Sequence, residues 1–203
     1  HAVCGLRNRP APKEGKGNEC DKMSKAAAAW HWKHTVQKVI DDAGPLTGKA
    51  FNNVLIDSYE TGQQNWTKGF EKEFQNRMGY NMIPYLPAVT GRVINNLDHT
   101  ERFLWDFRRV IADMWTENYY GHFAEMCHEN GLVLSCEPYG KPGNLDNFAV
   151  ADVVDIPMGE WWARRPSGRH NSSSKMPASA AHTNGRRFVG AEAFTAGRYG
   201  AAF

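Results

Sequence analysis

The fold of this chain is decided by the stretch NVLIDSYETGQQNW, residues 53–66. Its apolar run, 54–56, has no helical periodicity and predicts a short buried strand. The polar segment that follows holds two carboxylates, Asp57 and Glu60, before a glycine turn. In α/β folds the C-terminal ends of the strands bear the loops that do chemistry. We therefore expect a functional site immediately after this strand.

Three later segments repeat the pattern of an apolar run followed by a glutamate. They predict strands at 132–136, 150–156 and 187–191, followed by Glu137, Glu160 and Glu192. Any single glutamate is most simply a surface residue, and Glu137 could orient a neighbour while Glu160 could face solvent. Four glutamates in the same position after four strands, Glu60 included, are much harder to assign to chance.

Helical patterns separate these strands. We predict helices at 24–41, 71–77 and 98–130, the last with Asp98 and Glu101 as a capping box and an apolar stripe that belongs to the core. We expect loops at 1–20, 80–90 and 163–184, the last without any periodicity. His31 and His34 could form a metal pair on the first helix, but half-buried histidines beside Trp30 and Trp32 are the favoured interpretation.

Strands that alternate with helices predict a parallel sheet, because right-handed crossovers return each strand in the same direction. All four glutamates would then lie at one edge. An open doubly wound sheet would spread them apart, whereas a barrel would gather them at its mouth. No glycine-rich nucleotide fingerprint follows any strand. We therefore predict the α/β class, with a partial (β/α)8 TIM-type barrel.

Composition excludes several classes of function. The chain has 203 residues and a formal charge of +2, with interspersed charges and thus no clustered basic face for a nucleic acid. The arginines 164, 165 and 169 lie in a polar loop and are expected to be solvated. No apolar run reaches the roughly 18 residues of a membrane span. Cys127 and Cys136 are expected to be buried, reduced thiols.

Carboxylates and aromatic side chains together at a barrel mouth indicate sugar chemistry. Aromatic faces stack on pyranose rings, and two carboxylates supply the acid and the base that break an acetal. The aromatic candidates follow the same strands as the glutamates: Tyr59, Trp66, Tyr139, Trp161 and Trp162.

Several long motifs resemble the glycoside hydrolase family 106 α-L-rhamnosidases. These motifs are DSYETGQQNW (57–66), YLP (85–87), TGR (90–92), FLWDFRR (103–109), ENYY (117–120), EPYG (137–140), MGEWW (158–162) and AEAFT (191–195). The resemblance extends from about residue 17 to residue 195. It implies a catalytic (β/α)8 barrel in a larger multidomain enzyme, which removes terminal α-L-rhamnose by an inverting, calcium-assisted mechanism.

The resemblance also implies roles for particular residues. Glu60 corresponds to the general acid, Glu192 to the general base and Glu160 to a calcium contact. The remaining candidates are assigned to substrate binding: Asp57, Tyr59, Asn65, Trp66, Glu137, Tyr139 and Trp161. Inversion needs carboxyl groups roughly 6.5–9.5 Å apart, so that a water fits beside the base. Glu60 should be protonated and Glu192 ionised, and calcium would clamp two adjacent sugar hydroxyls.

We expect residues 1–203 to form an internal fragment of this barrel, with both flanks missing. The expected partner is a rhamnose-containing glycan or glycoside, and neither a nucleic acid nor a membrane. The localisation is left open, with a periplasmic or secreted parent protein as the expectation. Two alternatives remain, namely a barrel glycosidase for another sugar and a catalytically inactive carbohydrate-binding barrel.

Overall fold

A four-stranded parallel sheet is the centre of the molecule. The computed structural model describes residues 7–8, 11–140, 145–162 and 172–195. Its strands are β1 (Asn53–Ile56), β2 (Val133–Cys136), β3 (Ile156–Trp162) and β4 (Gly190–Thr195). Each strand pairs with the next in chain order, so the sheet order is β1-β2-β3-β4. Within this sheet the order never reverses, as it must at the switch point of a doubly wound fold.

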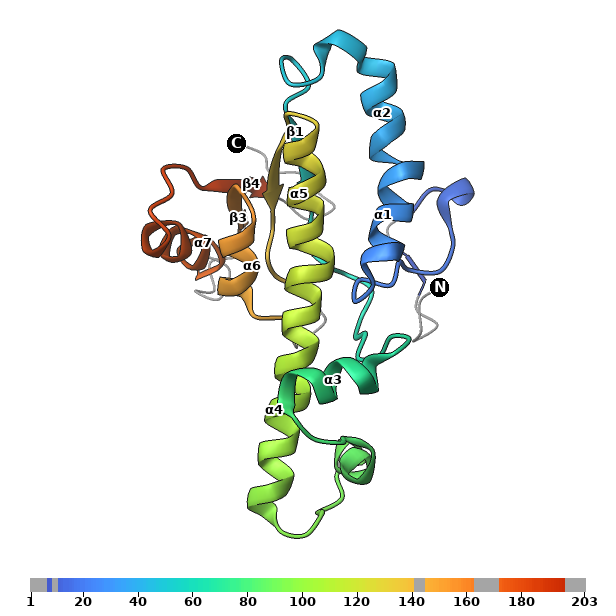
Figure 1. Cartoon of the computed structure of the whole chain (residues 1–203). Coiled ribbons are helices and arrows are strands. Elements are labelled where there is room, and N and C mark those ends of the chain that lie inside the picture. The colour runs from blue at the N-terminus through green and yellow to red at the C-terminus, as the bar shows by residue number, and fades with distance from the viewer. Residues whose placement is uncertain (1–6, 9–10, 141–144, 163–171, 196–203) are drawn as a thin grey trace.

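Helices precede the first strand and also occupy the connections between the strands (Figure 1). The α-helices are α1 (Lys25–His34), α2 (Val36–Ala43), α3 (Phe70–Met78), α4 (Leu97–Trp115), α5 (His122–Glu129), α6 (Asn147–Val153) and α7 (Ser172–Thr183). A π-helical turn, Thr116–Gly121, joins α4 to α5, and 3-10 turns lie at Lys13–Gly15, Gly44–Leu46 and Ile83–Thr90. None of the described helices is long and apolar enough to cross a membrane.

The segment from α4 to α5 runs as one continuous rod beside the sheet (Figure 1). The helix expected at 98–130 is therefore confirmed, with a π-helical turn inside it. Its apolar stripe is buried, from Phe103 to Met126. The expected cap is wrong by two residues: the side chain of Asn96, and not that of Asp98, accepts a hydrogen bond from the amide of His99, at 2.9 Å.

The helix expected at 24–41 is broken in two at Thr35, where φ is −126° and ψ is −82°. The Thr35 hydroxyl donates to the carbonyl of His31 at 2.7 Å, a local bond that competes with regular helical bonding. His34 stacks on Trp30 at 4.0 Å between ring centroids, whereas His31 lies 6.3 Å from the ring of Phe123. The two histidines thus have separate aromatic partners.

Two of the four expected strands are misplaced. Residues 147–153 form helix α6 because the Asp146 side chain caps it, accepting from the amide of Ala149 at 3.0 Å. The strands β3 and β4 begin later than expected, so Glu160 and Glu192 lie within strands and not beyond their ends. The loop expected at 163–184 contains α7, while 163–171 lies outside the described residues.

The two faces of the sheet have different surroundings. One face packs into the helical core through Val54, Ile56, Leu134 and Cys136. The other bears Leu55, which is 54% exposed, so no described element covers it there. The free thiols of Cys127 and Cys136 are buried, as expected.

Candidate active site

The uncovered face of the sheet bears a row of carboxylates near the C-terminal ends of its strands. Residues paired in register on parallel strands project to the same face, and side chains alternate along each strand. Glu160 of β3 pairs with Glu192 of β4. Asp57 follows β1 and Glu137 follows β2. Each lies two residues beyond a member of the register pair Leu55 and Ser135, so both project to the same face as that pair.

Three of these carboxylates converge although they come from three strands. Side-chain oxygens of Asp57, Glu137 and Glu192 all lie within 4.8 Å of one another. Adjacent strands are separated by about 4.8 Å, so a flat sheet would place β1 and β4 roughly 14 Å apart. The sheet must therefore curl toward this face, as in part of a barrel, and the carboxylates lie in its concavity.

Glu137 is the buried member of this group, with 2% of its surface exposed. Its Oε2 accepts a hydrogen bond from the amide of Ser58 at 3.2 Å, and the same amide donates to Asp57 Oδ1 at 2.6 Å. Its Oε1 has no hydrogen-bond partner among the described residues. Burial raises the pKa of Glu137 to about 8, with further increases from Asp57 and Glu192, whereas Tyr139 lowers it.

Protonation of Glu137, or its binding to a metal ion, would remove the cost of burying its negative charge. A buried carboxylate without a full set of donors is unstable when charged, because water is excluded from it. The pKa of Tyr139 is also raised, first by burial and then by the carboxylates of Glu137, Glu160 and Glu192. The site is therefore rich in carboxylates, and three of them lie close enough together to share a cation.

The two expected catalytic glutamates lie at the same end of this sheet. Glu60 follows β1 and accepts a hydrogen bond from the Ser58 hydroxyl at 3.2 Å. It also lines a cavity of about 430 Å³ whose wall includes Lys22, Tyr59 and Tyr119. Glu192 accepts from the Thr195 hydroxyl at 2.5 Å. Glu60 is not a member of the convergent group of three, but Ser58 contacts both, because its hydroxyl donates to Glu60 and its amide to Asp57 and Glu137.

The expected substrate-binding residues have different environments. The ring of Tyr59 is 5% exposed and packs edge-on against Trp115, with centroids 4.9 Å apart. Trp66 contacts Phe70 at 5.1 Å, and Asn65 is exposed beside it. The expected roles of Tyr59, Asn65 and Trp66 stay predictions.

Trp161, another expected substrate contact, comes from β3 and packs against a residue of β4. Its ring lies edge-on to that of Phe194, with centroids 5.0 Å apart. Phe194 adopts a left-handed φ of 63°, which is uncommon for a residue with a side chain. Such backbone conformations concentrate at functional sites, and this one is two residues after Glu192.

Sequence reasoning missed the residues that hold the loop after β1. The Ser58 amide and hydroxyl contact Asp57, Glu137 and Glu60 as described above. Asp21 and Lys22 contact the same loop from the short segment between the loop expected at 1–20 and the helix expected at 24–41. No local pattern marks either residue, because both act across more than 30 positions of sequence.

Comparison with known proteins found similar sequences and a similar structure. A family model described as alpha-L-rhamnosidase matches residues 1–203. A Formosa agariphila protein provisionally named beta-glucuronidase is 47% identical over 197 residues, which cover 96% of this chain and 16% of that protein. The structure of a rhamnosidase from Novosphingobium sp. PP1Y superposes with a TM-score of 0.83 at 35% identity, covering 95% of this chain and 19% of that one. The chain thus spans less than a fifth of the length of these relatives.

Proposed function

This chain belongs to the α-L-rhamnosidase family, and from this premise we propose that it forms part of the catalytic (β/α)8 barrel of an inverting α-L-rhamnosidase. The carbohydrate substrate would carry a terminal α-L-rhamnosyl group. The observation that carries this proposal is the convergence of Asp57, Glu137 and Glu192 on the concave face, with Glu60 at the same end of the sheet. Such a site offers an acid, a base and a place for a cation.

The acid and the base have separate roles in this reaction. Protonated Glu60 would donate its proton to the glycosidic oxygen while the bond to the anomeric carbon breaks. Ionised Glu192 would accept a proton from the water that attacks that carbon from the opposite face, so the configuration inverts. The hydroxyl of Thr195 orients the Glu192 carboxylate. Glu60 and Glu192 come from different strands, which allows the gap that such a water needs.

We also propose calcium as the cofactor, held by Asp57, Glu137 and one carboxylate oxygen of Glu192, whose other oxygen remains the base. Calcium prefers carboxylate oxygens, and these three residues offer them within 4.8 Å of one another. The unpartnered, buried Oε1 of Glu137 fits a metal ligand well. Glu160, the candidate from the sequence, is the register neighbour of Glu192 and could supply a further oxygen. When bound, calcium would neutralise the cluster and orient sugar hydroxyls.

The acid and base roles can be tested in the full-length protein. We expect Glu60→Gln and Glu192→Gln each to lower kcat on an α-L-rhamnoside by about 10²- to 10⁴-fold, the usual contribution of general acid or base catalysis. In calcium-free buffer, both variants should retain the thermal unfolding temperature of the unmodified protein. Glu129→Gln, an exposed change at the end of α5, serves as the control. Near-normal kcat in either site variant would remove that residue from the mechanism.

A second sugar specificity is favoured by one observation, the beta-glucuronidase name of the Formosa agariphila relative. A glucuronide bears a carboxylate, which the acidic group Asp57, Glu137 and Glu192 would repel unless a cation intervenes. Because the proposed calcium would offset this repulsion, charge alone does not choose between the two sugars. Assays of aryl α-L-rhamnoside and aryl β-D-glucuronide side by side decide between the two, while sugar binding without any hydrolysis would indicate an inactive barrel.

A further inference from the structure

A buried carboxylate outside the acidic group holds the loop that bears Glu60. Asp21 is 6% exposed and lies just before α1. Its Oδ1 accepts from the side-chain amide of Gln64 at 2.5 Å, and its Oδ2 accepts from the hydroxyl of Thr67 at 2.6 Å. Oδ1 also accepts from the amide of Met23 at 3.0 Å. Gln64 and Thr67 are themselves buried, so water cannot replace these bonds.

The next residue, Lys22, contacts the same loop on both sides of Glu60. Its backbone amide donates to Gln64 Oε1 at 3.1 Å, on the C-terminal side. Its ammonium lies 5.1 Å from the ring centroid of Tyr59, the residue directly before Glu60, and pairs with Glu19 at 2.5 Å. Tyr59 is also tied to the sheet, because its amide donates to the carbonyl of Tyr139 at 3.1 Å.

The short span from Tyr59 to Gln64 is therefore anchored at both ends, and Glu60 lies inside it. Surface loops are ordinarily mobile, and a displacement of about 1 Å at a reacting group can cost about 10² in rate. We propose that Asp21 is a positioning residue, which fixes the loop of residues 57–67 so that the Glu60 carboxyl meets the glycosidic oxygen. This inference rests on the proposed function of Glu60 as the general acid.

A positioning role and a merely structural role predict different substrate dependence. A misplaced acid matters when the leaving group is a poor one, such as a sugar alkoxide, and matters little when the leaving group departs as a stable anion. A general loss of folded protein would lower both rates alike. The test therefore compares kcat on a rhamnosyl disaccharide with kcat on 2,4-dinitrophenyl α-L-rhamnoside.

Gln64→Glu is the sharpest variant, because it places a second carboxylate against Asp21 Oδ1 while the bond to the Lys22 amide is kept. We expect kcat on the disaccharide to fall about 10- to 100-fold, and kcat on the activated aryl substrate to change less than about threefold. In the double variant, which combines Asp21→Asn with Gln64→Glu, the asparagine amide can donate to the introduced carboxylate. The disaccharide activity should then recover at least in part.

Hydrogen exchange of the amides at 58–67 gives a readout that does not depend on activity. Exchange should quicken in Gln64→Glu and slow again in the double variant. Asp113→Asn is the matched control, since Asp113 of α4 pairs with Arg77 of α3 and with Arg109 of α4 and forms no ion pair with the described residues of this loop. Thr67→Val, which removes only one hydroxyl donor, replaces Gln64→Glu if that variant fails to fold.

Any of three results would overturn the positioning role while leaving the proposed function intact. These are an equal loss of kcat on both substrates, unchanged hydrogen exchange at 58–67, and no recovery of disaccharide activity in the double variant. An unmodified protein that hydrolyses neither rhamnoside would overturn the proposed function, and the role of Asp21 in catalysis with it.

Discussion

At the scale of single residues, Glu137 shows how position changes the chemistry of a side chain. Glu137 and its sequence neighbours Cys136 and Pro138 are all buried, so its carboxyl is shielded from solvent. Burial and the adjacent Asp57 together favour the neutral form. A cation bound by Asp57, Glu137 and Glu192 would reverse that preference, because it stabilises the ionised form.

We predict a pH dependence of stability from this residue when calcium is removed by a chelator. The pKa of Glu137 is raised from 4.5 to about 8 in the folded state. Between these values the folded protein binds more protons than the unfolded one, so the free energy of unfolding should fall as pH rises from 4.5 toward 8. Thermal unfolding across this range should show a weaker slope in Glu137→Gln than in the unmodified protein.

The matched control is Glu129→Gln, which leaves the site unchanged. An equal slope in Glu137→Gln and the unmodified protein would contradict the assignment. Added calcium should stabilise the unmodified protein most at the alkaline end of the range, since a metal ligand must be deprotonated.

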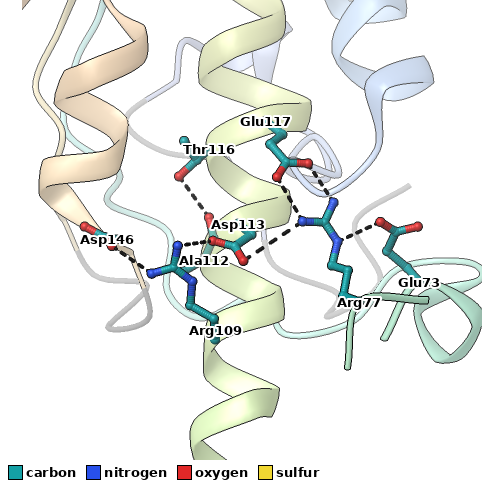
Figure 2. Close-up of polar contacts among 8 residues, drawn as sticks. All are labelled: Glu73, Arg77, Arg109, Ala112, Asp113, Thr116, Glu117 and Asp146. Carbon is teal, nitrogen blue, oxygen red and sulfur yellow. Dashed lines mark hydrogen bonds and ion pairs between the residues drawn. The ribbon is translucent and has the colours of Figure 1, made fainter. Parts of the chain in front are cut away.

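At the scale of elements, arginines on α3 and α4 determine how the helices meet (Figure 2). Arg77 of α3 donates to both carboxylate oxygens of Glu117, at 2.9 and 2.6 Å, and to Glu73 at 2.7 Å. Arg109 of α4 pairs with Asp146, the cap of α6, at 3.3 Å. These contacts join α3 to the π-helical turn and α6 to α4. Hydrogen bonding raises the pKa of Arg77 and lowers that of Glu117.

We predict that Arg77→Met destabilises the protein by about 1–2 kcal/mol, because a bidentate, charge-assisted contact is lost and two carboxylates remain without their cation. The loss should shrink below pH 4.5, where Glu117, with its lowered pKa, becomes protonated. Arg102→Met is the control, since Arg102 pairs with Asp98 on an exposed surface and should cost less than about 0.5 kcal/mol. Comparable unfolding temperatures for the two variants would contradict this ranking.

At the scale of the whole molecule, the curled sheet leaves Leu55 half-exposed on its concave face. In a closed barrel that face is filled by side chains from all strands. The described chain provides four of them, in the sequential order that a barrel requires. The stability effect of a substitution at Leu55 can therefore test whether further strands cover this face in the full-length protein.

We predict that Leu55→Ala lowers the free energy of unfolding more in the full-length protein than in the isolated 203-residue chain. In a complete barrel the change should cost about 2–4 kcal/mol, as for a buried leucine. In the isolated chain, where Leu55 is 54% exposed, it should cost less than about 1 kcal/mol and reduce the binding of a hydrophobic dye. Denaturant unfolding of both forms measures the difference, and equal costs would argue against a covered concave face.

The local pattern of the sequence was sufficient for β1, β2, α3 and the rod from α4 to α5. Short apolar runs that end at Asp57 and Glu137, and a long helical stripe that ends at Gly131, depend on near neighbours alone. The same reasoning failed at 150–156, because the three valines there favour a strand by propensity, whereas the structure has a helix capped by Asp146 at 147–153. The family motifs were also readable from the sequence.

Only the tertiary structure decided which carboxylates meet. Glu160 and Glu192 became strand residues through the register of β3 and β4, and the curl of the sheet brought Asp57, Glu137 and Glu192 within 4.8 Å. The raised pKa of Glu137 and the contacts of Asp21 with Gln64 and Thr67 arise in the same way. The physical reason is that secondary structure follows from the residues nearby in sequence, whereas distances and burial at the site depend on strand register and sheet curvature, which many distant residues set together.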